Sequence, residues 1–122
     1  MNQGYEPRLK EMADNIPGAL CASLTGTDGI GISFYQAGLE LDPTLADAEF
    51  ATMLSAARRA AENLEMGSLA EQTVATEKLI ILIKLVGTDF YLSAILQQGS
   101  GNLGMARLQM RKAAEEFKNL LY

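Results

Sequence analysis

The amino-acid sequence predicts an α+β fold in which helices pack against a five-stranded antiparallel sheet, with the elements in the order α-β-β-α-β-β-β-α. Apolar residues recur at helical spacing in three stretches, and five other stretches are short and strand-like. Glycine, proline and aspartate separate these stretches. The links between directly successive strands are too short to hold a crossover helix, so these strands are expected to pair antiparallel.

The first helix is expected over residues 5–16, where one face carries Leu9, Met12, Ala13 and Ile16. Pro17-Gly18 ends this helix, because the residue before a proline leaves the helical region and glycine turns freely. A β-hairpin follows over residues 19–37, since Asp28-Gly29 suits the tight turn between two antiparallel strands. In its second strand, one face is expected to carry Ile30, Ile32 and Phe34.

A long helix is expected from Asp42-Pro43 to about Leu64. The Asp42 side chain can accept from the free amides of the first turn, and proline suits the first helical position. Gly67-Ser68 ends the segment. The face of this helix that is expected to cover the sheet consists of Phe50, Met53, Leu54, Ala57, Ala60, Ala61 and Leu64.

Three more strands are expected over residues 71–76, 79–86 and 90–96. The run 79–86 is nearly continuous leucine, isoleucine and valine, as in a strand that is buried on both faces. Asn102 then caps a last helix. Its inner face is expected to consist of Leu103, Ala106, Met110, Ala113, Ala114, Phe117, Leu120 and Leu121.

Length and composition bound the function. The chain of 122 residues fits one domain, residues 1–122, and its 48% apolar content argues for a packed core. A net charge of −5, from 15 acidic and 10 basic residues, disfavours nucleic acid and a polybasic membrane anchor. No run approaches the roughly 20 apolar residues that span a bilayer, so no membrane insertion is expected.

Several kinds of chemistry lack their usual side chains. Histidine is absent, which removes imidazole catalysis, the usual serine and cysteine nucleophile pairs and most zinc sites. Cys21 is the only cysteine, so no internal disulfide forms, and the residues up to Lys10 lack the apolar core of a signal peptide. We therefore expect a cytoplasmic, non-catalytic protein with no metal and no cofactor, which works by binding other proteins.

The outer side of the long helix is less polar than a solvated face. It carries Ala48, Ala51, Thr52, Ser55, Ala56, Arg59 and Glu62. One interpretation is that alanine is common here because it favours helices. The other is a second contact face, because small side chains let another helix approach closely. Arg58, Arg59 and Glu62 at its margin would then set register and orientation.

A second candidate contact is the strand expected over residues 71–76. It is polar and β-branched and carries no proline or lysine before Lys78, so as an edge it could pair with a copy of itself. Such an isologous dimer would join two sheets and bring the long helices together. The candidate interface residues, for a dimer or another partner, are Ala48, Ala51, Thr52, Ser55, Arg58, Arg59, Glu62, Thr73, Val74 and Thr76.

Other motifs favour structural roles. Gly99, Gly101 and Gly104 match the dinucleotide fingerprint G-x-G-x-x-G, but the strand and acidic residue that should follow are missing. We expect these glycines to turn the chain, and Gly104 to let helix and strand pack closely. Cys21 is expected to be a buried, inert thiol. Two further clusters need no special chemistry: the acids Asp42, Asp47 and Glu49, which suit a helix start, and the pair Arg58 and Arg59, which suits a solvated face or ion pairs with Glu62.

The order of elements and two stretches resemble the roadblock domain family, which includes dynein light chains and regulators of small Ras-like GTPases. The hairpin at Thr27-Asp28-Gly29-Ile30 resembles the early hairpin of the family, and residues 101–108 resemble its Asn-Leu-Gly helix start. The resemblance runs from about Tyr5 to Leu120. The turn at Glu77-Lys78 departs from the family pattern, because it has no glycine.

The resemblance implies a profilin-like sandwich that forms a homodimer with a continuous sheet and paired long helices. It also implies a scaffold or regulator bound to a small Ras-like GTPase, and it carries over no catalytic residue. Two other functions stay open: a passive adaptor that assembles a complex without changing GTP hydrolysis, and a small-ligand or nucleotide-binding domain that uses the glycine loop.

Overall fold

The computed structural model describes residues 4–122; residues 1–3 of the predicted domain lie outside this range. Residues 4–122 form three helices and five strands in the predicted order. Each lies within a few residues of its predicted bounds: α1 (Glu6–Asp14), β1 (Ala19–Gly26), β2 (Gly31–Gln36), α2 (Pro43–Asn63), β3 (Glu71–Ala75), β4 (Leu79–Val86), β5 (Phe90–Gln97) and α3 (Leu103–Leu121). The predicted fold class is confirmed.

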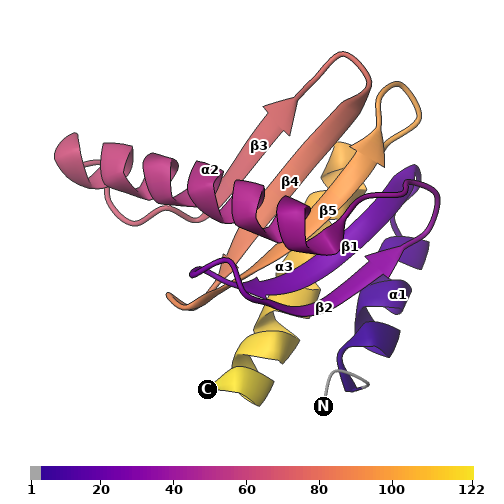
Figure 1. Cartoon of the computed structure of the whole chain (residues 1–122), viewed down its shortest axis with the longest axis horizontal. Helices are drawn as coiled ribbons and strands as arrows, with labels where there is room; N and C mark the ends of the chain where they lie inside the picture. Colours follow the sequence, from indigo (N-terminus) through magenta and orange to yellow (C-terminus); the bar gives the residue numbers. More distant parts are fainter. Residues whose placement is uncertain (1–3) are drawn as a thin grey trace.

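The five strands form one antiparallel sheet in the order β2-β1-β5-β4-β3, so β2 and β3 are its two edges (Figure 1). The central pairing of β1 with β5 joins parts of the chain that are separated by α2, β3 and β4. Helix α2 covers one face of the sheet, and helices α1 and α3 lie on the other.

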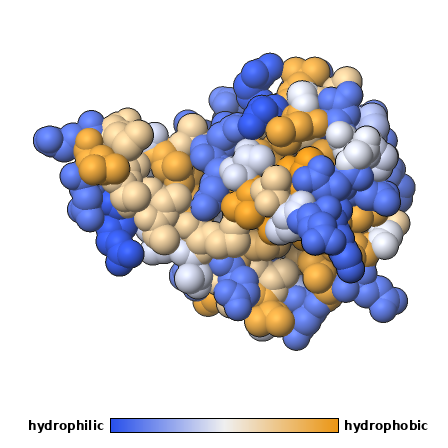
Figure 2. Space-filling view, turned by 90° about the horizontal axis from the view of Figure 1, so that it is seen from above, coloured by the Kyte–Doolittle hydropathy of each residue, from blue (hydrophilic) through white to orange (hydrophobic). Residues whose placement is uncertain are grey.

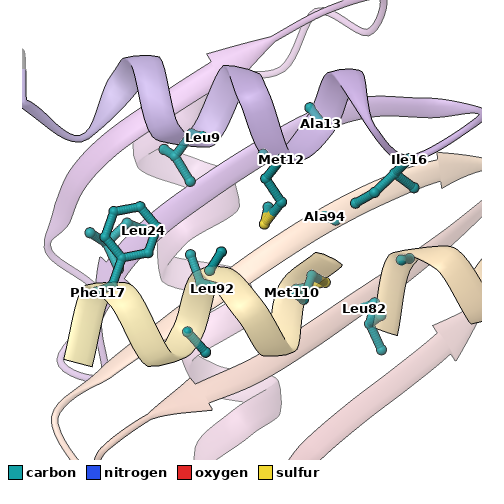
Figure 3. Close-up of a cluster of buried hydrophobic side chains, with 14 of the residues drawn as sticks. Leu9, Met12, Ala13, Ile16, Leu24, Leu82, Leu92, Ala94, Met110 and Phe117 are labelled. Carbon is teal, nitrogen blue, oxygen red and sulfur yellow. The ribbon is translucent and has the colours of Figure 1, made fainter. Parts of the chain in front are cut away.

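The larger part of the core lies between the sheet and the pair α1 and α3. Leu9 and Met12 of α1 meet Met110 and Phe117 of α3 over the central strands (Figure 3). All four side chains are fully buried. The guanidinium of Arg8 donates two hydrogen bonds to the carboxylate of Glu116, of 2.8 and 2.9 Å, and so joins the outer sides of these helices.

Side-chain caps hold the starts of the two long helices. Asp42 Oδ1 accepts from the backbone N–H of Thr44 at 3.0 Å, and Asn102 Oδ1 accepts from that of Met105 at 2.9 Å. Both caps satisfy amides that the helix itself leaves without partners, as predicted.

Two predicted faces are wrong in part. Ile32 packs in the α1–α3 core but Phe34 packs in the α2 core, because a bulge between Leu24 and Thr25 shifts the register of β1 with β2. The predicted inner face of α3 is confirmed from Leu103 to Phe117 and at Leu121, but Leu120 is 66% exposed near the end of the helix.

None of the helices in residues 4–122 combines the length and apolarity of a membrane span.

Candidate protein interface

The N-terminal half of α2 packs on the sheet. Phe50 and Leu54 are buried against a layer formed by Cys21, Ile83, Tyr91 and Ile95. Leu54 is only 1% exposed. This half therefore confirms the predicted sheet-covering face.

The C-terminal half of α2 extends past the sheet on the side of β3 (Figure 1). The 21 residues of α2 measure about 31 Å, whereas five strands span about 19 Å, so a helix that crosses them must project beyond. Ala60 is exposed and Leu64 is 69% exposed, while Met53, Ala57 and Ala61 are half-buried. The prediction that the whole apolar face covers the sheet is thus wrong for these last turns.

The projecting arm, residues 57–66, has five polar or charged residues, and between them it carries small and apolar side chains that are exposed or half-buried. Figure 2 shows them spread along the part that stands out from the body of the molecule. Met66, at its tip, is 72% exposed. Exposed apolar side chains such as these make the arm a candidate contact surface for another protein.

Most of the predicted outer-face residues are accessible. Ala48, Thr52, Ser55, Arg59 and Glu62 are exposed or partly exposed, and Arg58 is half-buried. Thr52 donates its hydroxyl to the carbonyl of Ala48 at 3.0 Å, within the helix. No ion pair within 4.0 Å in residues 4–122 includes Arg58, Arg59 or Glu62, so the predicted ion pairs with Glu62 are not formed.

Ala51 is an exception to the predicted outer face, since it is only 8% exposed. The turn between β1 and β2 lies against it: a Cβ on Gly29 would be 3.7 Å from both the Ala51 Cβ and the Ala48 Cα. A hollow between this turn and the helix is lined by Thr27, Asp28, Gly29, Ala48, Ala51, Thr52, Ser55, Ala56 and Arg59. The predicted outer face of α2 therefore forms one wall of a shallow groove.

Strand β3 is an edge of the sheet, as predicted, and it ends at Ala75. Thr73 is exposed and Val74 is half-buried. Thr76 lies in the turn to β4, where its hydroxyl oxygen accepts from the backbone N–H of Leu79 at 3.0 Å. A threonine side chain thus supports the turn in which a glycine was missing.

Two side chains matter at the β3 edge: Arg107, which anchors the strand, and Gln72, which has a buried acceptor. Arg107 of α3 donates to Glu71 at 2.8 Å and to the Thr73 hydroxyl at 3.3 Å, which fixes β3 against the helix behind it. The Oε1 atom of Gln72 is buried without a hydrogen-bond donor. A buried acceptor without a donor costs stability at this edge.

The sequence interpretation missed the buried role of Asp47. This residue is 4% exposed, its Oδ1 atom accepts from Thr25 Oγ1 at 2.9 Å, and its backbone carbonyl accepts from the Tyr91 hydroxyl at 2.9 Å. Burial raises the pKa of the Asp47 carboxyl, and the Thr25 hydrogen bond opposes this shift. The signal was present, because Asp47 lies three and seven residues before Phe50 and Leu54 on the buried face.

The glycine loop before α3 is packed against the end of α1. The Gly101 amide donates to the carbonyl of Gln97 at 2.8 Å, and the Asn102 amide donates to the carbonyl of Pro17 at 3.0 Å. A Cβ on Gly18 would be 2.5 Å from the Gly101 Cα. The predicted close packing at Gly104 is wrong: it is exposed, and a Cβ there would meet only Asn102 Oδ1, at 3.6 Å.

Cys21 is buried, as predicted. Its thiol lies 3.4 Å from the Leu39 carbonyl, and burial raises its pKa to about 11. At neutral pH the thiol is therefore protonated, which makes it a poor nucleophile.

Solved structures of other proteins share this fold. No family model matches the sequence, and no match is found among curated proteins. Among solved structures, a Roadblock/LC7 domain from Streptomyces avermitilis matches with a TM-score of 0.87 at 16% identity, over 95% of this chain and 96% of that one. The gliding protein MglB from Thermus thermophilus matches with a TM-score of 0.83 at 18% identity, over 93% of this chain and 84% of that one.

A closer sequence match decides the family. MglC from Myxococcus xanthus is 32% identical over 98% of both chains, with a TM-score of 0.67. The chain belongs to the roadblock domain family. This roadblock domain thus shares its fold with MglB and MglC, and a further MglB structure is described as having a tetrameric arrangement.

Proposed function

We propose that this roadblock domain is a non-catalytic, cytoplasmic, homodimeric regulator or scaffold that binds a small Ras-like GTPase and modulates its nucleotide cycle. The whole chain acts as one domain in this proposal. The observation that carries it is the position of the apolar projecting arm of α2 beside the open edge of β3. The tetrameric arrangement of an MglB protein supports self-association as a property of related chains.

The support for the dimer lies on the side of the molecule where α2 extends past β3. A second copy that pairs with β3 would extend the sheet and satisfy backbone groups that an edge leaves open. Its own α2 would then lie beside the projecting arm, where Ala57, Ala60 and Ala61 permit close approach. The contact is two-fold, because the same strand and arm are used on both copies.

The proposal of a GTPase partner rests on the resemblance to the roadblock family. The resemblance implies that the dimer acts on the switch regions of the GTPase itself and donates no catalytic residue. The sequence agrees with this role, since it has no histidine. The exposed outer face of α2, from Ala48 to Glu62, is the surface that we assign to the dimer or to the GTPase.

The dimer is tested with a matched pair of charge substitutions. Ala60→Glu places a carboxylate on the arm, whereas Asn119→Glu places one on the exposed side of α3, on the other face of the sheet. We expect light scattering at micromolar concentration to give a dimer mass for wild type and Asn119→Glu and a monomer mass for Ala60→Glu. A monomeric wild type would contradict the proposal.

The GTPase is tested with the Ras-like GTPases encoded in the same genome, beginning with any whose gene is adjacent. Each is mixed with the roadblock domain, and co-elution and single-turnover GTP hydrolysis are measured. A changed rate supports regulation, and co-elution at an unchanged rate supports the passive adaptor. If none of these GTPases binds the roadblock domain, the proposed function is wrong.

A further inference from the structure

The other edge of the sheet, β2, borders a hollow of about 430 Å³ between this strand and the start of α2. Its lining comes from two short segments and one acid: Gly29, Ile30, Gly31, Ile32, Ser33, Phe34, Pro43, Thr44 and Asp47. This hollow and the β2 edge, here called the β2 site, are separate from the arm and from β3. Strands β1, β5 and β4 lie between β2 and β3.

Asp47 gives the β2 site its charge. The residue is 4% exposed, and within residues 4–122 its one side-chain donor is Thr25, whose hydroxyl donates to Oδ1. The second oxygen, Oδ2, lies against Gly31, where a Cβ would collide with it. Glycine at this position of β2 therefore leaves the space that the carboxylate occupies.

No lysine or arginine in residues 4–122 pairs with this carboxylate. The ion pairs within 4.0 Å in that range involve Arg8, Lys10 and Arg107, all with other acids. A buried carboxylate is costly without a cation or a full set of donors. Within residues 4–122, Asp47 has one side-chain donor and no cation, so a cation supplied from outside would complement it.

The surroundings of Asp47 are apolar and open. Ile30 is 69% exposed beside the hollow, and Leu45, in the first turn of α2, is 59% exposed. Strand β2 pairs only with β1, so its outer backbone groups have no partner strand in the described chain. An unpaired strand edge next to exposed apolar side chains is a template for an added strand.

We infer that the β2 site binds an extended segment of a partner protein, which adds a strand to β2 and places a lysine or arginine against Asp47. The backbone of β2 holds the segment, Ile30 and Leu45 contact its apolar side chains, and the carboxylate selects its basic residue. Arginine fits best, because its planar guanidinium can donate two hydrogen bonds to one carboxylate. The inference stands apart from the dimer and from the GTPase, because neither uses β2.

The probe is a phage-displayed library of random ten-residue peptides, selected on the immobilised full chain. We expect the enriched peptides to carry a basic residue flanked by apolar or β-branched residues. The best peptide and a version with norleucine in place of the basic residue are then synthesised, and their binding is measured by fluorescence anisotropy. Loss of the charge is expected to weaken binding at least about ten-fold, as for other buried charge-assisted hydrogen bonds.

Three variants test the assignment to Asp47. Asp47→Asn keeps an acceptor for Thr25 and is expected to weaken binding at least about ten-fold. Glu49→Gln, the matched control, removes one exposed carboxylate two residues away and is expected to leave binding unchanged. Ile30→Lys, at an exposed position that does not disturb folding, is expected to weaken binding by charge repulsion and lost apolar contact, so the test holds even if Asp47→Asn fails to fold.

Hydrogen exchange locates the peptide. We expect it to slow exchange in β2 and to leave β3 unchanged. The inference is overturned if no peptide is enriched, if enriched peptides lack a basic residue, if Asp47→Asn binds as wild type does, or if protection appears at β3. The last result would show peptide addition at the edge that we assign to the second copy.

Discussion

Asp47 connects the chemistry of a single carboxyl group with the stability of the fold. Its pKa is raised by burial in the folded chain, so the folded chain holds this proton more tightly than the unfolded chain does. The ionised form at neutral pH therefore costs stability. The cost is absent below both pKa values, so stability falls as pH rises from the unfolded pKa through the folded pKa.

We predict that Asp47→Asn is at least as stable as wild type near neutral pH, and that this difference shrinks or reverses in acid. Urea unfolding at about pH 7 and about pH 4.5 measures it. Glu49→Gln, at an exposed site on the same helix, serves as the control for loss of a charge. A loss of stability in Asp47→Asn that is the same at both pH values would show that the carboxylate is needed for packing alone.

Two glycines near the loop before α3 are predicted to respond oppositely to alanine. Gly18 has φ +81° and its Cβ would be 2.5 Å from the Gly101 backbone, so Gly18→Ala should cost more than about 2 kcal/mol. Gly104 is exposed in the first turn of α3 with room for a Cβ, so Gly104→Ala should be neutral or stabilise by up to about 1 kcal/mol. Denaturant unfolding checks both, and a tolerated Gly18→Ala would refute the packing role.

At the scale of elements, residue spacing along the chain predicts whether a segment is a helix or a strand. Which other elements that segment contacts depends on the tertiary fold. The period of α2 identified the side that Phe50 and Leu54 bury, but not where the sheet ends beneath it. Lengths alone, about 31 Å of helix against about 19 Å of sheet width, do not predict this, because they leave open the direction in which the helix crosses the strands. The β1–β2 bulge had no signal in the sequence either, because it depends on the register in which the two strands pair.

The candidate site was predictable to a similar degree. Alanine content marked the outer face of α2, and a polar, β-branched run without proline or lysine marked β3 as a candidate edge, because both follow from local composition. The β2 site was not predicted, because it needs Gly31 and Asp47 side by side, and only the tertiary fold brings them together. Ala51 was misplaced for the same reason, since the turn that covers it belongs to the hairpin.

The projecting arm is predicted to be the least stable part of α2 in a monomer. Its last turns lack the burial that holds residues 46–54, so their amides should exchange at least about ten-fold faster there. Hydrogen exchange on monomeric Ala60→Glu and on dimeric Asn119→Glu makes the comparison. We expect the arm to gain protection in the dimer, and equal protection in both proteins would place the second copy elsewhere.

At the scale of the whole molecule, α2 is the one element shared by both proposed surfaces. Its start forms a wall of the β2 site and its end forms the arm. Asp47 and Ala60 are 13 positions apart on one helix, which is about 20 Å along its axis. Sites that distant and without shared partners usually behave additively.

We therefore predict that the two surfaces work independently. Asp47→Asn should leave the dimer mass unchanged, Ala60→Glu should leave the affinity for the selected peptide within about two-fold of wild type, and the dimer should bind two peptides. Light scattering and anisotropy on both variants and on the double variant measure this. If Ala60→Glu weakens binding of the peptide more than about ten-fold, α2 transmits a change between its ends. Partner binding at β2 would then depend on dimerisation.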